Sequence, residues 1–387
     1  LLDPREYTTK YPFTTIEGRP DRKYELRRAL ETYAWEGVDA TAIALTFQSL
    51  IKKAFQGTSL NQYITPSEVV EFMMNLVRPK TTDTLLDFEC GSGSFLRSAL
   101  SAGVDPQNIY GIDIADLPYY VAKVYLALYT GTRGKAIDTL PINQGNGLLY
   151  EGETRDIVIS NPAGGSQYDK DGELGDVSKV MAKLNTDLDG DGRVDANVFT
   201  EYYFSVQQAI KNCKSGGQIC LVVPEGLLAN STDDKLRQFI TSHAKVKAII
   251  SLPRRIFYKG TTTRNVQSAG SRSGQKFSIL YCVRNSVKFN DVSTKSYEAY
   301  PIFLASIDEE SNLENKLASV YEQYKRWALS GNLASQIIVE KPIQKIHKKP
   351  LQSALIDPEM PLFDHPVEKP KPTITTTITD ALKSLFD

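Results

Sequence analysis

The segment that most constrains the fold of this chain is residues 85–96, which read LLDFECGSGSFL. An apolar run ends in Asp87, Gly91 and Gly93 follow, and a helical pattern then begins. This order predicts a strand, a tight turn and a helix whose free N–H groups face the turn. Cofactors that resemble nucleotides bind on such turns at the carboxyl ends of parallel strands. The segment therefore predicts a parallel α/β fold with a cofactor turn.

Two further strand-like segments end in polar residues that suit the same edge of a sheet. Residues 109–113 end in Asp113, about 20 residues beyond the turn, where an acid can accept hydrogen bonds from ribose hydroxyls. Residues 156–160 lead directly into Asn161 and Pro162. These segments strengthen the prediction of a cofactor site, which two glycines alone support only weakly.

In their order along the chain, these motifs resemble those of adenine-specific DNA methyltransferases that use S-adenosylmethionine, in particular the methylation subunit of type I restriction–modification systems. The turn matches the family's Asp-x-x-Cys-Gly-Ser-Gly motif at Asp87, Cys90, Gly91, Ser92 and Gly93. Residues 63–66, 217–226 and 249–257 resemble three further family segments. The resemblance covers roughly residues 45–285, so several ordered elements carry it rather than one motif.

The resemblance implies an S-adenosylmethionine-dependent methyltransferase (Rossmann-like) fold, with a seven-stranded α/β sheet, a helical N-terminal region and a proline-rich C-terminal tail. It implies methylation of the exocyclic amine of adenine in DNA, with Asn161 and Pro162 accepting hydrogen bonds from that amine. The expected cofactor-binding residues are Thr65, Asp87, Gly91, Ser92, Gly93, Asp113 and Asn146. We expect DNA and a separate specificity subunit as partners, because the chain has no convincing sequence reader of its own.

One position departs from the family motif. Where the family reads Asn-Pro-Pro-Phe, this chain reads Asn161-Pro162-Ala163-Gly164. The family's aromatic residue stacks on the flipped-out base, an interaction worth roughly 1–3 kcal/mol, and glycine has no ring to replace it. Tyr168 is close enough in sequence to take that place. Two alternatives stay open: a catalytically degenerate subunit for DNA binding or assembly, and methylation of a protein glutamine or another nucleic acid.

Strand and helix patterns alternate along the middle of the chain, which predicts a parallel sheet. The predicted strands are residues 84–88, 109–113, 140–144, 156–160, 218–223, 246–252 and 277–283, the last of which the resemblance makes antiparallel. Thr65-Pro66-Ser67-Glu68 predicts a capping box at the start of a helix that ends near Val77. The predicted divisions are an N-terminal arm and helical region at 1–62, a catalytic domain at 63–300 with an acidic insertion at 169–195, and a C-terminal helix and tail at 301–387.

The composition is that of an ordinary globular protein, with 41% hydrophobic and 24% charged residues among 387. A net charge of −1 offers no overall attraction for nucleic acid, so a DNA-binding surface requires local clusters of basic residues. Four scattered cysteines and three histidines show no metal-binding spacing, which favours reduced thiols and a cytoplasmic location. No apolar run is long enough to cross a membrane, so we expect neither a signal peptide nor a membrane partner.

A basic stretch at residues 254–276 is the candidate DNA-binding surface. It contains no acid, and Gly, Ser and Thr separate its basic residues, which are Arg254, Arg255, Lys259, Arg264, Arg272 and Lys276. A flexible basic loop at the carboxyl edge of the sheet can bind phosphates without sequence preference. The alternative is an exposed hairpin loop that binds nothing.

Residues 187–195 read DLDGDGRVD and resemble the start of an EF-hand calcium loop. The candidate ligands are Asp187, Asp189, Asp191 and Asp195. The twelfth position of such a loop supplies a bidentate carboxylate, but here it is Val198. Weak calcium binding and a solvated acidic loop are therefore both open.

Overall fold

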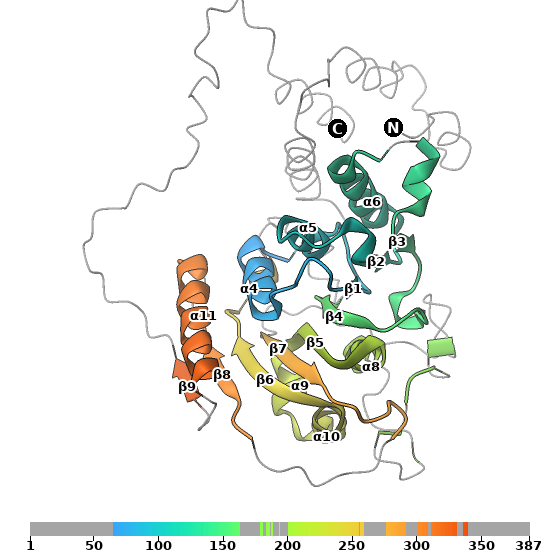
Figure 1. Cartoon of the computed structure of the whole chain (residues 1–387). Helices are drawn as coiled ribbons and strands as arrows, with labels where there is room; N and C mark the ends of the chain where they lie inside the picture. The colour runs from blue at the N-terminus through green and yellow to red at the C-terminus, as the bar shows by residue number, and fades with distance from the viewer. Residues whose placement is uncertain are drawn as a thin grey trace, which may run out of the picture. The chain divides into compact units, whose positions relative to one another are not determined.

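Figure 1 shows the computed structural model of the chain. It describes residues 65–132, 134–162, 179–180, 183–185, 187–188, 193, 200–254, 256–258, 276–291, 300–308, 311–330 and 336–339. These residues belong to one compact unit that includes Phe55–Glu340. The predicted N-terminal arm, the helices before residue 65 and the proline-rich tail lie outside the described residues, and the predicted division boundaries stay a prediction.

The core of the described structure is a nine-stranded sheet in the order β3-β2-β1-β4-β5-β7-β6-β8-β9. The strands are β1 Leu85–Asp87, β2 Ile109–Asp113, β3 Ile142–Gln144, β4 Arg155–Ser160, β5 Cys213–Pro224, β6 Ala244–Ser251, β7 Phe277–Arg284, β8 Phe303–Ser306 and β9 Gln336–Val339. β7 pairs antiparallel with β5 and β6, and the other neighbouring strands pair parallel. Such a sheet places the carboxyl ends of eight strands along one edge.

Helices cover both faces of this sheet (Figure 1). They are α4 Ser67–Val77, α5 Ser94–Ser101, α6 Asp116–Thr130, α8 Glu201–Asn212, α9 Glu225–Ala229, α10 Asp234–His243 and α11 Leu313–Leu329. α4 and α5 lie on one face and α8, α9 and α10 on the other (Figure 1). α11 packs against α4, where Arg78 Nε donates to Tyr321 Oη at 2.7 Å. None of the helices in the described part of the chain is long and apolar enough to span a membrane.

All seven predicted strands are confirmed within a few residues, as is the antiparallel direction of β7. The predicted strand count is wrong, because β8 and β9 extend the sheet beyond β6. Each of these strands is only four residues long, so neither shows enough alternation to be recognised from sequence. Both fall in the part of the chain for which we predicted a helix and a tail.

The predicted capping box at the start of α4 is also wrong, although the helix itself ends at Val77 as predicted. Pro66 occupies the N-cap position, and no side chain caps the helix. The Pro66 carbonyl accepts hydrogen bonds from the amides of Val69 and Val70, each at 3.0 Å. The Thr65 hydroxyl is engaged elsewhere, with Asn161.

The chain order reverses between β1 and β4, which are neighbours in the sheet. From β1 the chain moves outward through β2 to β3, and it then returns to form β4 on the other side of β1. In open parallel sheets, ligands bind in the crevice outside the carboxyl ends of the strands at this reversal. The topology therefore places the ligand site between the segments that follow β1 and β4.

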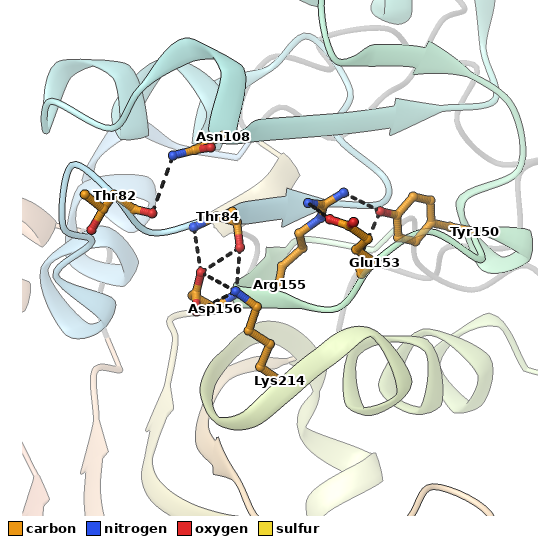
Figure 2. Close-up of polar contacts among 8 residues, drawn as sticks. All are labelled: Thr82, Thr84, Asn108, Tyr150, Glu153, Arg155, Asp156 and Lys214. Carbon is orange, nitrogen blue, oxygen red and sulfur yellow. Dashed lines mark hydrogen bonds and ion pairs between the residues drawn. The ribbon is translucent and has the colours of Figure 1, made fainter.

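The opposite, amino edge of the sheet is held by a polar network that Figure 2 shows. The Asp156 carboxylate accepts hydrogen bonds from Thr84 N at 2.9 Å, Thr84 Oγ1 at 2.7 Å and Lys214 Nζ at 2.9 Å. These contacts join the beginnings of β1, β4 and β5. Beside them, the buried Arg155 guanidinium stacks on the Tyr110 ring, 3.4 Å from its centroid, and donates to Tyr150 Oη at 2.9 Å.

The same network controls the ionisation of Asp156. Burial opposes the charged form, but the hydrogen bonds from Thr84 and the contact with Lys214 outweigh it and lower the pKa of Asp156 to about 2. Because this value lies below the usual 3.8, the network stabilises the fold fully above about pH 4 and loses its contribution as pH falls toward 2.

We expect Asp156→Ala to destabilise the protein by about 1–3 kcal/mol at pH 7, because it leaves the Thr84 amide and hydroxyl without an acceptor. Urea unfolding at pH 7, 4 and 3 measures the effect, and the difference from the unaltered protein should shrink below pH 4. Glu153→Ala is the matched control, since this carboxylate is 88% exposed and contacts Arg155 only at 3.5 Å. Equal losses in the two variants would contradict the assigned role of Asp156.

Candidate active site at the carboxyl edge of the sheet

The turn after β1 has a backbone shape that requires glycine. Gly91 and Gly93 have φ values of 53° and 83°, in the left-handed region. The Cys90 amide donates to the Ile112 carbonyl at 2.8 Å, which fixes the turn against β2. A Cβ added at Gly91 would meet no heavy atom within 4 Å, whereas one at Gly93 would lie 3.1 Å from Ala122 Cβ. The turn is therefore packed against α6 at Gly93 and open at Gly91.

Asp113, at the end of β2, holds the glycine turn in place. Its Oδ2 atom accepts a hydrogen bond from Gly91 N at 2.8 Å, and its Oδ1 atom accepts one from Ala115 N at 2.9 Å. Burial raises the pKa of Asp113, and these two hydrogen bonds oppose the rise. Each carboxylate oxygen can accept a further hydrogen bond, so the predicted contact with ribose stays a prediction.

Asp87, at the end of β1, is 1% exposed and lies under the turn. Its Oδ1 atom accepts hydrogen bonds from Ser160 Oγ at 2.7 Å and from Glu89 N at 3.3 Å. Burial raises the pKa of Asp87 to about 8, although both hydrogen bonds favour the charged form. The carboxyl group is therefore mostly neutral at pH 7, and it links the carboxyl end of β1 to that of β4.

The Asn-Pro segment directly follows Ser160, so the contact with Asp87 places it beside the glycine turn. Asn161 Nδ2 donates a hydrogen bond to Thr65 Oγ1 at 2.9 Å, and Thr65 is only 9% exposed. Pro162 is buried. The structure thus brings together Thr65, Asp87 and Asn161, three predicted site residues that are far apart in the sequence.

Asn146 follows β3 at the same edge. Gly145 N donates to the Asp113 carbonyl at 2.9 Å, which joins this segment to the end of β2. Asn146 Oδ1 accepts from Leu148 N at 3.0 Å and caps the short helix η3, Gly147–Leu149. Asn146 therefore lies near the predicted cofactor residues, and its contact with a cofactor stays a prediction.

Three further residues at this edge were not among the predicted site residues. Ser160 is fully buried and reaches Asp87, and Glu89 accepts from Ser205 Oγ at 3.0 Å, which ties the turn to α8. Ile114, directly after Asp113, is 53% exposed, one of the two large apolar side chains that are exposed among the described residues. The signal for Ile114 was an apolar residue placed after a strand-ending acid.

The described residues cover the basic stretch only in part. Arg255, Lys259, Arg264 and Arg272 lie outside them. Lys276 is 18% exposed and forms ion pairs with Glu225 Oε2 at 3.5 Å and Asp308 Oδ1 at 3.4 Å. Its ammonium group is therefore already engaged, and DNA contact by this stretch stays a prediction.

The acidic insertion is anchored to the fold where the structure describes it. Val180, Leu184 and Leu188 are buried, and the backbone of Asn185 exchanges two hydrogen bonds with the Gln207 side chain, at 2.7 and 3.0 Å. Of the four candidate calcium ligands, Asp187 alone lies among the described residues, and within those residues no group of acids, histidines or cysteines could hold a metal ion.

The parallel sheet with one reversed strand, and the glycine turn at its switch point, define an S-adenosylmethionine-dependent methyltransferase fold. A solved structure of a class I S-adenosylmethionine-dependent methyltransferase from Listeria monocytogenes, described as putative, has a TM-score of 0.55 and 18% identity, and covers 83% of this chain and 88% of its own. A modification subunit of a putative type I restriction enzyme from Vibrio vulnificus has a TM-score of 0.54 and 16% identity, and covers 76% of this chain and 58% of its own.

A family match over more than half of the sequence shows which family this chain belongs to. The pattern of the N-6 DNA Methylase family matches residues 47–270, more than half of the chain, so the chain belongs to this family. The type I restriction enzyme EcoEI methylase subunit of Escherichia coli is 23% identical over 301 residues, which are 73% of this chain. The chain spans 57% of the length of that relative.

The residues at the switch point fit S-adenosylmethionine. A ligand can approach the turn at Gly91, where even an added Cβ would meet nothing within 4 Å. The Asp113 carboxylate contacts the Gly91 amide and can accept hydrogen bonds from a ribose, and the next residue, Ile114, exposes an apolar side chain. Both are suited to an adenosine group, which combines a polar sugar with a flat, weakly polar ring.

We expect Gly91→Ala to weaken S-adenosylmethionine binding at least tenfold in calorimetry, because the added methyl group occupies the open side of the turn. Gly131→Ala is the matched control, since Gly131 also has a left-handed φ of 67° and nothing within 4 Å, but ends α6 away from the site. Both variants should lose about 1–2 kcal/mol of stability from backbone strain. A similar affinity in both would contradict the placement of the cofactor.

Proposed function

We propose that this protein transfers the methyl group of S-adenosylmethionine to the exocyclic amine of adenine in DNA. The observation that carries the proposal is the 2.7 Å hydrogen bond from Ser160 Oγ to Asp87 Oδ1, which sets Asn161-Pro162 beside the glycine turn. Family membership supports the reaction, and the names of relatives such as the EcoEI methylase subunit support a role in restriction–modification.

The proposed mechanism relies on positioning. S-adenosylmethionine supplies an activated methyl group, so no nucleophilic side chain is needed. Asn161 Oδ1 and the Pro162 carbonyl accept hydrogen bonds from the two N–H groups of the amine and thereby aim its nitrogen at the glycine turn. Asp113 and the open turn at Gly91, Ser92 and Gly93 would hold the cofactor, while Ile114 would pack on its adenine ring.

Asp87 contributes to this site without adding a charge. Its pKa near 8 leaves the carboxyl group mostly protonated at pH 7. A protonated carboxyl group can accept from Ser160 and still donate one hydrogen bond. We propose that it sets the spacing between the two strand ends rather than contacting the methyl group.

We expect Asn161→Ala to lower methyl transfer by at least a hundredfold while S-adenosylmethionine affinity stays within about twofold, because the lost acceptor orients the amine and not the cofactor. Transfer of a radiolabelled methyl group to unmethylated genomic DNA measures the rate, and calorimetry measures affinity. Asn108→Ala is the control, since Asn108 lies at the amino edge of the sheet (Figure 2). Retained transfer in Asn161→Ala would refute the proposed role.

The replacement of the family's Pro-Phe by Ala163-Gly164 favours a second candidate function, a degenerate subunit for DNA binding or assembly. The two candidates differ in one measurement. If the unaltered protein binds S-adenosylmethionine but transfers no methyl group to DNA, either alone or with proteins that copurify with it, the second candidate is supported. We also propose DNA and a separate specificity subunit as partners, and a cytoplasmic location. For residues 187–195, weak calcium binding and a solvated acidic loop are still the two alternatives.

We expect neutralisation of Arg264 and Arg272 together to weaken binding to all DNA sequences alike. For duplex DNA, each lost phosphate contact should flatten the slope of log affinity against log salt by about 0.9. Lys276→Gln is the comparison within the same stretch, and its slope should change less, because Lys276 is held by Glu225 and Asp308. An unchanged slope in the double variant would exclude this stretch as a DNA-binding surface.

A further inference from the structure

The hydrogen bond between Thr65 and Asn161 joins two motifs that are 96 residues apart in the sequence. Family resemblance assigns Thr65 to the cofactor, and the local pattern assigns it to a helix cap. The structure instead shows its hydroxyl oxygen accepting from Asn161 Nδ2 at 2.9 Å. The contact is partly buried, so water competes with it only weakly.

The position of Thr65 next to helix α4 anchors its side chain. Thr65 immediately precedes Pro66, which occupies the N-cap position of α4. α4 is fixed to the sheet because most of its apolar residues are buried and Gln218 Nε2 donates to the Val77 carbonyl at 2.8 Å. The Thr65 hydroxyl is therefore attached to an anchored helix rather than to a free loop.

An asparagine side chain has one accepting end and one donating end, and rotation by 180° exchanges them with little change in shape. Only the accepting end, Oδ1, can bind the N–H groups of a substrate amine. With Oδ1 turned toward the amine, Nδ2 needs an acceptor of its own, since an unpaired buried N–H group is unfavourable. Thr65 Oγ1 is that acceptor in the structure.

We infer that Thr65 is a positioning residue for the proposed methyl transfer, which holds the Asn161 amide through Nδ2 and so leaves its carbonyl oxygen available to the substrate amine. This inference rests on the proposed function, and it gives Thr65 a task that does not involve the cofactor. It follows that loss of the hydroxyl lowers kcat and leaves the affinity for S-adenosylmethionine intact.

The test compares Thr65→Val, which keeps the shape and removes the oxygen, with Thr65→Ser, which keeps the oxygen. We expect Thr65→Val to lower kcat for methyl transfer about tenfold or more, with KM for DNA and Kd for S-adenosylmethionine within about twofold of the unaltered chain. Thr65→Ser should recover most of the lost kcat. The inference is overturned if Thr65→Val keeps full kcat, or if its loss lies entirely in cofactor affinity.

A second measurement separates this inference from the proposed function. If the unaltered chain binds S-adenosylmethionine but shows no transfer, the proposed function fails, and thermal unfolding of Thr65→Val, Asn161→Ala and the double variant then decides whether the contact exists. Shifts in Tm that are less than additive in the double variant support a direct contact. Additive shifts overturn it.

Discussion

Side-chain hydrogen bonds join β1 to β4 at both ends of the two strands. The geometry of the proposed site depends on these two contacts. At the amino end, Thr84 donates to Asp156, and at the carboxyl end Ser160 donates to Asp87. The two strands are neighbours at the point where the chain order reverses, so their ends define the ligand crevice. A shift of one strand along the other would separate Asn161 from the glycine turn. The register between β1 and β4 thus determines the geometry of the proposed site as well as the packing of the sheet.

The two carboxyl groups in these contacts are of the same type but have opposite ionisation. Asp156 binds an ammonium group and two donors of Thr84, which together lower its pKa to about 2. Asp87 is buried near two other acids, Glu89 and Asp113, and burial raises its pKa to about 8. At the amino edge the contact between β1 and β4 involves a charged carboxylate, whereas at the carboxyl edge it involves a mostly neutral carboxyl group. The neutral form of Asp87 thus avoids a fully buried charge, which desolvation would oppose.

Much of the fold could be predicted from the sequence, because strands such as β4 and β5 carry apolar runs that end in turn residues, and because Gly91 and Gly93 mark the turn. The order of the motifs also indicated that Asp87, Asp113 and Asn161 share one edge. The four-residue strands β8 and β9 could not be predicted, since their stability comes from pairing with an existing sheet edge rather than from their own pattern. The capping box failed for a related reason, because a distant partner binds Thr65.

The contact between Thr65 and Asn161 shows why a local motif can mislead about the partner of a side chain. A hydroxyl group near a helix start can cap the helix, contact a ligand or hold another side chain, and these roles share one sequence pattern. The partner decides among them, and the partner here lies 96 residues away. Because α4 is packed on the sheet, a hydroxyl group on the residue just before its N-cap is held next to an anchored helix. A side chain that must present one end of its amide to a substrate gains most from such a support, since a rotation of the amide would remove the acceptor without disturbing the fold.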